Sequence, residues 1–299
     1  MRRALIALLI PATVVFAVAS IRAIPAAADA RPTLRVATFN IHKGESRRGP
    51  YDLERTIDAI HRLGVDLIGV QEVMRNDAGF GCDDQPALIA EGLRRRSGLP
   101  WNYVHAKAWI TEKTECAKAG HGDGVATEGL AFFTRERIVD SSVVRLNEGR
   151  VGLAVRLARM PEVPVVVTHL AANRQNQADR VHELGILLPW ARQFGPGILV
   201  GDFNAEAQAT ELEPLWTSYV DGWPASAASG TARGVANGAT RPNGRSRIDY
   251  VLHVPRADLV LESVEVIDTE TLGLGEVSDH SPVVATFRRV FPVASPHTP

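Results

Sequence analysis

The chain has 299 residues, of which 45% are hydrophobic and 22% charged, and its formal net charge is −1 at pH 7. This is a globular composition, long enough for one large core or two small ones. The near-neutral charge excludes the strongly basic surface of a nonspecific nucleic-acid binder, so any contact with a polyanion must be local or mediated by a metal ion.

The first 30 residues are predicted to be a secretory signal peptide. Arg2 and Arg3 give a basic start, the residues from Ala4 to Ile21 are almost continuously apolar, and an alanine-rich stretch follows. An uncleaved membrane anchor is the alternative, because about 18 apolar residues are the lower limit for spanning a bilayer. Cleavage would lower the net charge to −3 and place the protein outside the cell or in the periplasm.

Strands and helices alternate in the N-terminal part of the chain. The buried strands are predicted at Leu34 to Asn40 and Val65 to Gln71, and the helices at Leu53 to Leu63 and Gln85 to Ser97. A long polar stretch between Met74 and Glu128 is predicted to be irregular, with a turn at its His-Gly-Asp-Gly run, residues 121–124.

Two cysteines, Cys82 and Cys116, lie in this irregular stretch. In an exported protein a lone pair of cysteines is more often a disulfide than a catalytic thiol or half of a metal site. We therefore predict that Cys82 and Cys116 form a disulfide, which would limit the conformational entropy of the loop.

The C-terminal part is predicted to be richer in strands than in helices. Strands are expected at residues 129–134, 138–146, 152–157, 163–169, 198–202, 248–254, 259–267 and 282–288, and helices at 175–192 and 206–218. The segment from Asp221 to Arg247 is rich in Gly, Ala, Ser and Asn and is predicted to be a loop. Residues 291–299 are expected to be a frayed tail.

These elements predict an α/β (α+β) fold in one domain, residues 31–290. The helices are too few for one per strand, which argues against a barrel of eight βα units. Two mixed β-sheets packed face to face, with helices on the outside, fit the pattern better.

Polar residues stand at the ends of several predicted buried strands: Asn40, Glu72, His169 and Asp202. A single such residue usually caps a helix or makes a turn. Their repetition is harder to explain in that way, because a carboxylate at the end of an apolar strand is costly unless it is paired or bound to a metal. Since strand ends gather at one edge of a sheet, we expect these side chains to meet in one pocket.

The residue types indicate metal-assisted chemistry. The oxygen atoms of Glu72, Asp279 and the amide of Asn40 suit Mg²⁺, or alternatively Mn²⁺ or Ca²⁺. The sequence has no Cys/His cluster of the kind that binds zinc. Histidines and further carboxylates supply proton transfer and orientation. Such a site can bind a phosphate and hold a water in line with it.

Six short motifs occur in order along the chain. They are Thr38-Phe39-Asn40, Gln71-Glu72-Val73, Thr168-His169-Leu170, Gly201-Asp202-Phe203-Asn204, Arg247-Ile248-Asp249-Tyr250 and Ser278-Asp279-His280-Ser281-Pro282. Together they closely resemble the endonuclease/exonuclease/phosphatase superfamily, whose members include deoxyribonuclease I, AP endonucleases, neutral sphingomyelinases and inositol-phosphate 5-phosphatases. The resemblance covers Leu34 to about Phe287 and implies a four-layer α/β sandwich.

The resemblance also implies roles for the motif residues. Glu72, with Asn40 nearby, would hold the divalent ion, and Asp279 would lie beside that ion or contact it. Asp202 would orient or deprotonate the attacking water, and Asn204 would donate a hydrogen bond to a phosphoryl oxygen.

Both histidines are expected to contact the phosphate. By the same resemblance, His280, paired with Asp249, and His169 would stabilise the transition state, and one of them would act as a general acid or base. Glu128 stands where deoxyribonuclease-like members have a carboxylate that orients the first histidine. Arg150 stands where they have an arginine that contacts phosphate. A solvated surface charge is the alternative for each of these two.

The sequence does not identify the substrate, because one fold supports many substrates. It only allows the candidate activities to be ranked. A nuclease or general phosphodiesterase comes first, with extracellular nucleic acid as a candidate substrate. A lipid phosphodiesterase of the sphingomyelinase kind comes second and a phosphomonoesterase third. A secreted binding protein on the same scaffold is the alternative from a different class, although all the core motif residues are present. The sequence indicates no obligate protein partner, and contact with a membrane only through an unprocessed N-terminal segment.

Overall fold

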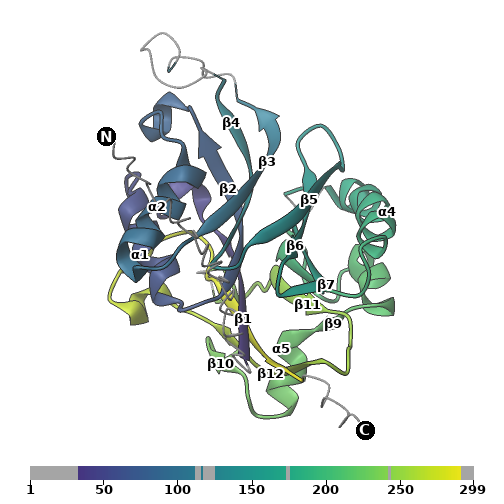
Figure 1. The fold of residues 1–299 in the computed structure, drawn as a ribbon. Coiled ribbons are helices and arrows are strands. Elements are labelled where there is room, and N and C mark those ends of the chain that lie inside the picture. Colours follow the sequence, from purple (N-terminus) through teal and green to yellow (C-terminus); the bar gives the residue numbers. More distant parts are fainter. Residues whose placement is uncertain (1–32, 112–115, 117–124, 173–175, 242–243, 291–299) are drawn as a thin grey trace, which may run out of the picture. The chain divides into compact units, whose positions relative to one another are not determined.

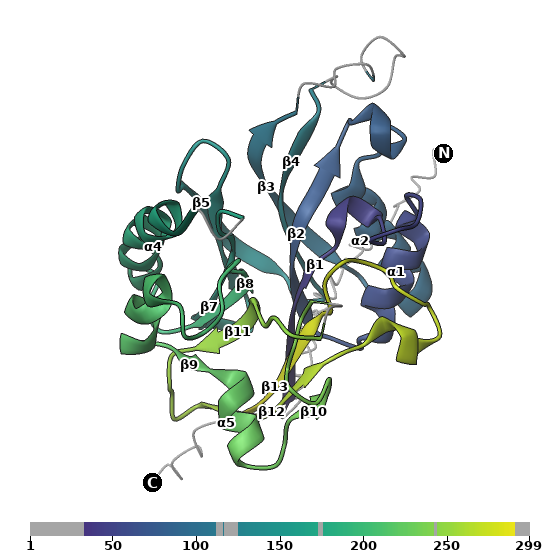
Figure 2. The same cartoon turned by 180° about the vertical axis from the view of Figure 1, so that it is seen from behind.

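The computed structural model describes residues 33–111, 116, 125–172, 176–241 and 244–290. Two β-sheets face each other and helices lie on their outer faces, as Figures 1 and 2 show from opposite sides. The predicted signal peptide, the predicted turn at 121–124 and the predicted tail lie outside the described residues.

The first sheet has the strand order β10-β12-β13-β1-β2-β4-β3. Its two central strands, β1 and β2, run parallel, and each is flanked by an antiparallel neighbour. The strands are β1 (Thr33–Asn40), β2 (Leu67–Arg75), β3 (Asn102–Ile110), β4 (Thr127–Thr134), β10 (Arg233–Gly234), β12 (Leu259–Val266) and β13 (Val283–Arg289).

The second sheet has the order β5-β6-β7-β8-β11-β9. Within it β7 and β8 are parallel, and β11 lies antiparallel to β8. The strands are β5 (Ile138–Arg145), β6 (Val151–Leu157), β7 (Met160–His169), β8 (Ile198–Asp202), β9 (Val220–Asp221) and β11 (Asp249–His253).

The helices cover the two outer faces. Those on the first sheet are α1 (Leu53–Arg62) and α2 (Gln85–Ser97), and α4 (Gln177–Arg192) lies on the second sheet together with the 3₁₀ segment η4 (Thr210–Thr217). The remaining short elements are η1 (His42–Gly44), η2 (Ala78–Phe80), α5 (Gly222–Ala228) and η5 (Thr269–Leu272). The predicted four-layer sandwich is confirmed.

The apolar runs of the central strands follow from this layering. In β2, Leu67 faces the core between the sheets, whereas Ile68 and Val70 face the core under α1 and α2. Successive side chains of a strand point to opposite faces, so a strand that is covered on both sides must be apolar at every position.

Two strands of the first sheet were not predicted, β3 and the two-residue β10. The strand β3 lies within the stretch that the sequence indicates to be irregular, and it pairs with β4 at the edge of the sheet. Much of β3 is exposed or half-buried, with Ala106 and Ala108 as its buried positions. An edge strand with small buried side chains carries little of the hydrophobic periodicity that identifies a strand.

Two predictions in the C-terminal part need correction. The helix expected at 206–218 is limited to the 3₁₀ segment η4, which contains Pro214, a residue that cannot donate to a helical backbone ladder. The loop expected from Asp221 to Arg247 contains α5 and the short strand β10. The helix α5 begins after Asp221, whose carboxylate accepts a hydrogen bond from the backbone N–H of Trp223.

The predicted disulfide is present. Cys82, just after η2, is bonded to Cys116, and their Cα atoms lie 5.6 Å apart. The bond ties the segment that follows β2 to the connection between β3 and β4. Within the described ranges, no helix is long and apolar enough to cross a membrane.

Candidate active site

The predicted site residues meet where strands of the two sheets end. In the second sheet, Asp202 lies opposite His169 on one side and opposite Asp249 on the other. In the first sheet, β1 ends at Asn40, whose side-chain amide nitrogen lies 3.1 Å from Oδ2 of Asp202. This hydrogen bond joins the two sheets at their facing edges, so the predicted convergence of strand ends is found.

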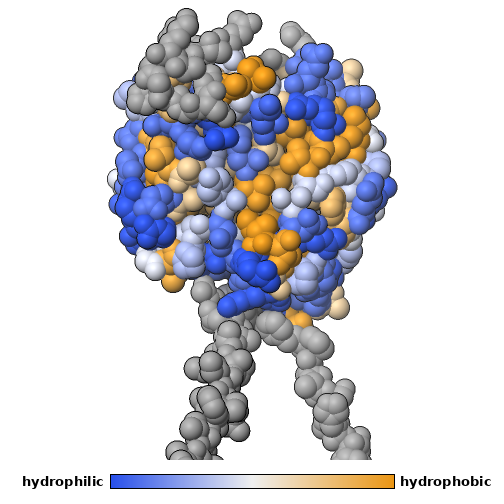
Figure 3. Space-filling view, turned by 45° about the horizontal axis from the view of Figure 1, so that its top comes forward, coloured by the Kyte–Doolittle hydropathy of each residue, from blue (hydrophilic) through white to orange (hydrophobic). Residues whose placement is uncertain are grey.

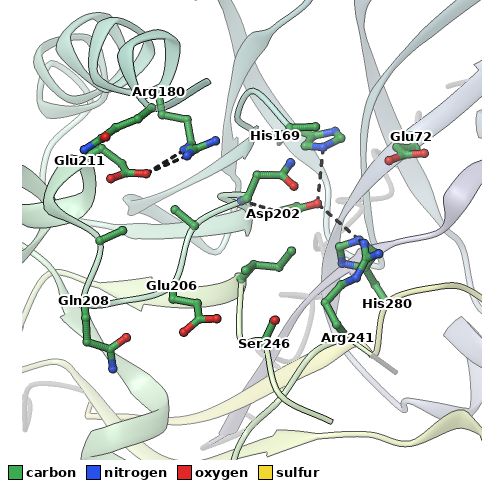
Figure 4. Close-up of a pocket in the computed structure, with 16 residues that line it drawn as sticks. Glu72, His169, Arg180, Asp202, Glu206, Gln208, Glu211, Arg241, Ser246 and His280 are labelled. Carbon is green, nitrogen blue, oxygen red and sulfur yellow. Dashed lines mark hydrogen bonds and ion pairs between the residues drawn. The ribbon is translucent and has the colours of Figure 1, made fainter. Parts of the chain in front are cut away.

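The carboxylate of Asp202 is the centre of the cluster. Its Oδ2 atom lies 3.5 Å from Nε2 of His169 and 3.6 Å from Nε2 of His280, in addition to its contact with Asn40. Figure 4 shows both histidines directed at this carboxylate. Asp202 is 1% exposed, so its charge depends on these neighbours rather than on solvent.

The segment that carries His280 is fixed to the end of β1. Ser278 donates a hydrogen bond to the backbone carbonyl of Asn40 at 2.7 Å, and its hydroxyl accepts one from the backbone N–H of His280 at 3.2 Å. On the other side of the ring, Nδ1 of His280 lies 2.8 Å from Oδ2 of Asp249. This serine, from the Ser-Asp-His motif, therefore sets the position of the histidine through the backbone.

The two histidines are driven to opposite protonation states. Burial lowers the pKa of His280, but Asp249 and Asp202 outweigh it and raise that pKa to about 9. Burial, followed by the positive charge of Arg150, lowers the pKa of His169 well below its usual range. A cationic and a neutral imidazole on one carboxylate can serve as a proton donor and a proton acceptor.

The pKa of Asp202 is raised to about 7, first by burial and then by the negative charge of Asp249. The proximity of His280 and hydrogen bonds from Asn204 and Asn40 act in the opposite direction. A carboxylate with a pKa near neutrality is suited to accept a proton from water at physiological pH.

Glu72 reaches the site through an irregularity in β2. The pairing of β2 with β4 shifts between Val70 and Val73, and Glu72, inside this bulge, has a φ of 57°. A positive φ is uncommon for a residue with a side chain, and strained positions of this kind cluster at functional sites. The bulge brings Oε1 of Glu72 to 3.0 Å from the amide nitrogen of Asn40.

The residues present fit a divalent metal ion. Asp249 and Asp279 each have a buried Oδ1 atom without a hydrogen-bond partner among the described residues, and the carboxylate of Glu72 adds hard donor oxygens. The side-chain oxygen of Asn40 accepts a hydrogen bond from the backbone N–H of His42 at 3.0 Å, and its nitrogen faces Glu72. A second group could also hold a metal ion. It consists of Asp202, Asp249 and His280, whose ligand atoms lie within 4.8 Å of one another. The oxygen-rich group suits Mg²⁺ better, because Nδ1 of His280 is already bonded to Oδ2 of Asp249 at 2.8 Å and Mg²⁺ prefers oxygen ligands.

Asn204 lines the same cavity as Asp202. Its amide nitrogen donates to the backbone carbonyl of Leu170 at 3.0 Å, and its backbone N–H donates to Oδ1 of Asp202 at 2.9 Å. Its φ of 52° is a second left-handed conformation in the site.

Glu128 and Arg150 both lie beside His169. Arg150, Glu128 and His169 line one small cavity, but it is the guanidinium of Arg150 that lies 2.9 Å from Nδ1 of His169. Glu128 is buried and pairs with Lys43 at 3.6 Å. The ring contact that the family resemblance implies for Glu128 is therefore made by Arg150 in this structure.

Lys43 also lies at the site, although the sequence pattern did not predict it there. Its ammonium nitrogen lies 3.8 Å from Oε2 of Glu72 and 3.6 Å from Oε2 of Glu128. The turn that carries it has three consecutive residues with positive φ, from His42 to Gly44, and Gln85 donates a hydrogen bond to the Lys43 carbonyl at 2.7 Å. Its position three residues after Asn40, which ends β1, was the available signal.

A large cavity opens from this cluster. Its volume is about 720 Å³, which is more than a phosphate group alone requires and is within the range of ligand-binding pockets. Figure 4 shows it extending from Glu72 and His280 past Asp202 towards α4 and η4. Arg180 and Glu211 form a buried ion pair at that far end, with 2.8 Å between the guanidinium and the carboxylate. The sequence pattern did not predict this pair either.

Comparison with known proteins agrees with the geometry. The family model described as "Endonuclease/Exonuclease/phosphatase family" matches residues 37–280. No curated protein sequence matches the chain significantly.

Solved structures share the fold at low sequence identity. An endonuclease/exonuclease/phosphatase from Beutenbergia cavernae is 24% identical, with a TM-score of 0.66 over 89% of this chain and 74% of that one. The human Nocturnin catalytic domain, solved with bound sulfate anion, is 22% identical, with a TM-score of 0.63 over 87% of this chain and 96% of that one. A family protein from Leptotrichia buccalis is 18% identical, with a TM-score of 0.62 over 86% of this chain and 100% of that one. The chain belongs to the endonuclease/exonuclease/phosphatase family, whose members are hydrolases of phosphate esters.

Proposed function

We propose that the protein is a secreted phosphodiesterase of the nuclease type that requires a divalent metal ion. The observation that carries this proposal is the set of contacts on Oδ2 of Asp202, where Asn40, His169 and His280 converge from both sheets. The family assignment supports a phosphoester substrate. The secretory signal predicted in residues 1–30 supports export and, with it, extracellular nucleic acid as the substrate.

In this proposal Glu72 and Asn40 would hold the metal ion, with Asp279 beside it. When bound, Mg²⁺, or Mn²⁺ or Ca²⁺ in its place, would neutralise charge on the phosphoryl oxygens. The amide of Asn40 faces Glu72 and Asp202 together, so it links the metal-binding carboxylate to the carboxylate that receives the proton.

Proton transfer is assigned to Asp202 and the histidines. Asp202, with its pKa near 7, accepts the proton of the attacking water. His280, kept cationic by Asp249, donates a hydrogen bond to the phosphoryl group as negative charge develops there. Neutral His169 and the second N–H of the Asn204 amide complete the set of contacts with the phosphate.

Hydrolysis of bis-p-nitrophenyl phosphate by the secreted protein tests this proposal. We expect turnover with Mg²⁺ that is abolished by EDTA and restored by excess Mg²⁺ or Mn²⁺. A screen of DNA, RNA, sphingomyelin and nucleotide esters then ranks the substrates. Absent or metal-independent turnover would favour the alternative of a binding protein. N-terminal sequencing of the exported protein locates the cleavage site of the signal peptide.

A lipid phosphodiesterase is the second candidate, favoured by the surface. Figure 3 shows apolar residues in a band across the face it presents, between polar residues. Exposed apolar side chains on β3 and β5 include Ile110, 58% exposed, and Val143, 50% exposed. Exposed apolar patches mark surfaces for binding other molecules, including membranes. Faster turnover of sphingomyelin in vesicles than of DNA would favour this candidate.

A further inference from the structure

Arg241 lies at the active site although none of the predicted motifs contains it. One terminal nitrogen of its guanidinium is 2.7 Å from Nε2 of His280 and 3.1 Å from Oδ2 of Asp279. Figure 4 shows the side chain reaching to His280 at the wall of the cavity. Arg241 and His280 also line a second cavity, of about 350 Å³.

The backbone that carries Arg241 is tied to the catalytic segments. The buried hydroxyl of Thr240 accepts hydrogen bonds from the backbone N–H groups of Ile248, at 3.1 Å, and Asp249, at 3.3 Å. The Thr240 carbonyl accepts a hydrogen bond from the N–H of Ser281 at 2.7 Å. Arg241 is therefore fixed relative to both members of the Asp249–His280 pair, as a residue that acts with them must be.

The chemistry of the side chain fits a phosphate group. A guanidinium presents five N–H donors in a planar fork, which matches two oxygens of one phosphate. The side chain of Arg241 is 34% exposed, so it faces both the cavity and His280. When His280 is cationic, its Nε2–H and the guanidinium are both donors, and at 2.7 Å they repel each other. An anion that accepts from both would relieve this repulsion.

We propose that Arg241 binds the phosphoryl group of the substrate, donating to a non-bridging oxygen held beside His280 and Asp202. This proposal rests on the phosphoesterase function above. Arg241 is then a catalytic residue of the site rather than only a counter-charge for Asp279.

The test uses Arg241→Met, with Arg233→Met as the matched control. Arg233 is exposed, and its guanidinium bonds to the backbone carbonyls of Gly230 and Ala232, away from the site. Calorimetry of the metal-free protein measures the binding of orthophosphate. We expect about a tenfold or larger loss of affinity in Arg241→Met and a wild-type value in Arg233→Met. The value of kcat/KM for bis-p-nitrophenyl phosphate should fall by at least about tenfold in Arg241→Met alone.

The opposite result is equally defined. If Arg241→Met binds orthophosphate like the wild type while its affinity for Mn²⁺, measured by electron paramagnetic resonance, changes, then Arg241 only neutralises Asp279 and the proposal is wrong. If Arg241→Met does not fold, Arg241→Gln takes its place with the same expectations. If the wild type hydrolyses no ester, the proposed function fails, whereas orthophosphate binding still decides the role of Arg241.

Discussion

Asp202 and His280 are the residues on which the chemistry depends most. Each is buried, and each makes contacts that a smaller side chain cannot replace. We expect Asp202→Ala and His280→Ala to lower turnover by at least about a hundredfold, because each change removes one positioned proton or water contact. Steady-state hydrolysis of bis-p-nitrophenyl phosphate with Mg²⁺ measures the effect.

The controls for these variants are exposed residues of the same types, Asp140→Ala on β5 and His182→Ala on α4. Both should retain wild-type turnover. Thermal unfolding shows whether the active-site variants keep their fold. Near-normal activity in a folded Asp202→Ala or His280→Ala variant would refute the assignment.

The sequence pattern correctly placed His169 and Asp202 at the ends of buried strands. A polar residue that follows an apolar run marks the end of a buried strand, so these positions could be predicted. Lys43 and Arg241 lie on turns, where charged residues are common and carry no periodic signal. Their roles depend on backbone conformation and on loop anchoring, such as the bonds to Thr240, which the sequence pattern does not encode.

At the scale of elements, the central strands and long helices could be predicted from the sequence, whereas the elements at the sheet edges could not. The helix α2 begins and ends at the predicted residues, because Asp84 caps its start and Gly98 ends it in a left-handed conformation. The strand β3 escaped prediction because its side chains are mostly not buried. The bulge at Glu72 escaped it as well, since a bulge depends on pairing with β4.

The strand β3 carries His105, which makes folding stability depend on pH. Burial, followed by the positive charge of Arg75, lowers the pKa of His105 to about 4, and its Nε2 atom has no hydrogen-bond partner among the described residues. In the unfolded chain the ring titrates near pH 6.5. As pH falls from about 6.5 to about 4, the unfolded chain takes up a proton that the folded protein does not, so stability falls by up to about 3 kcal/mol.

Urea unfolding of wild type and His105→Gln at pH 7.5, 5.5 and 4.5 checks this effect. Gln does not titrate, so the stability of His105→Gln relative to the wild type should improve as pH falls through this window. The exposed His182→Gln serves as the control and should follow the wild type. Parallel pH profiles for wild type and His105→Gln would show that the buried ring does not govern acid stability.

At the scale of the whole sandwich, the site exists only because the two sheets pack closely. Glu72 and Asn40 come from the first sheet, and Asp202 and His169 from the second. The sequence indicated two facing sheets, but not which strands would be neighbours or how near the sheets would come. Spacing between sheets is set by side chains that meet from distant parts of the chain.

Gly69 in β2 sets this spacing at one point. A Cβ atom built on Gly69 would lie 2.7 Å from a methyl group of Val200 and 2.9 Å from both methyl groups of Val167, on the opposite sheet. We expect Gly69→Val to lower the free energy of unfolding by about 1–3 kcal/mol through overpacking. It should also lower kcat, although it touches no catalytic residue, because it moves the strand that carries Glu72 away from Asp202.

Thermal unfolding and steady-state kinetics of Gly69→Val measure both effects. Gly185→Ala is the matched control, because Gly185 lies within α4 and nothing stands within 4 Å of a Cβ added there. That change should leave kcat unaltered and stabilise the protein by up to about 1 kcal/mol, the difference in helix propensity between Ala and Gly. A Gly69→Val protein that is less stable but fully active would mean that the two halves of the site tolerate changes in sheet spacing, and that convergence at the strand ends depends on the Asn40–Asp202 bond instead.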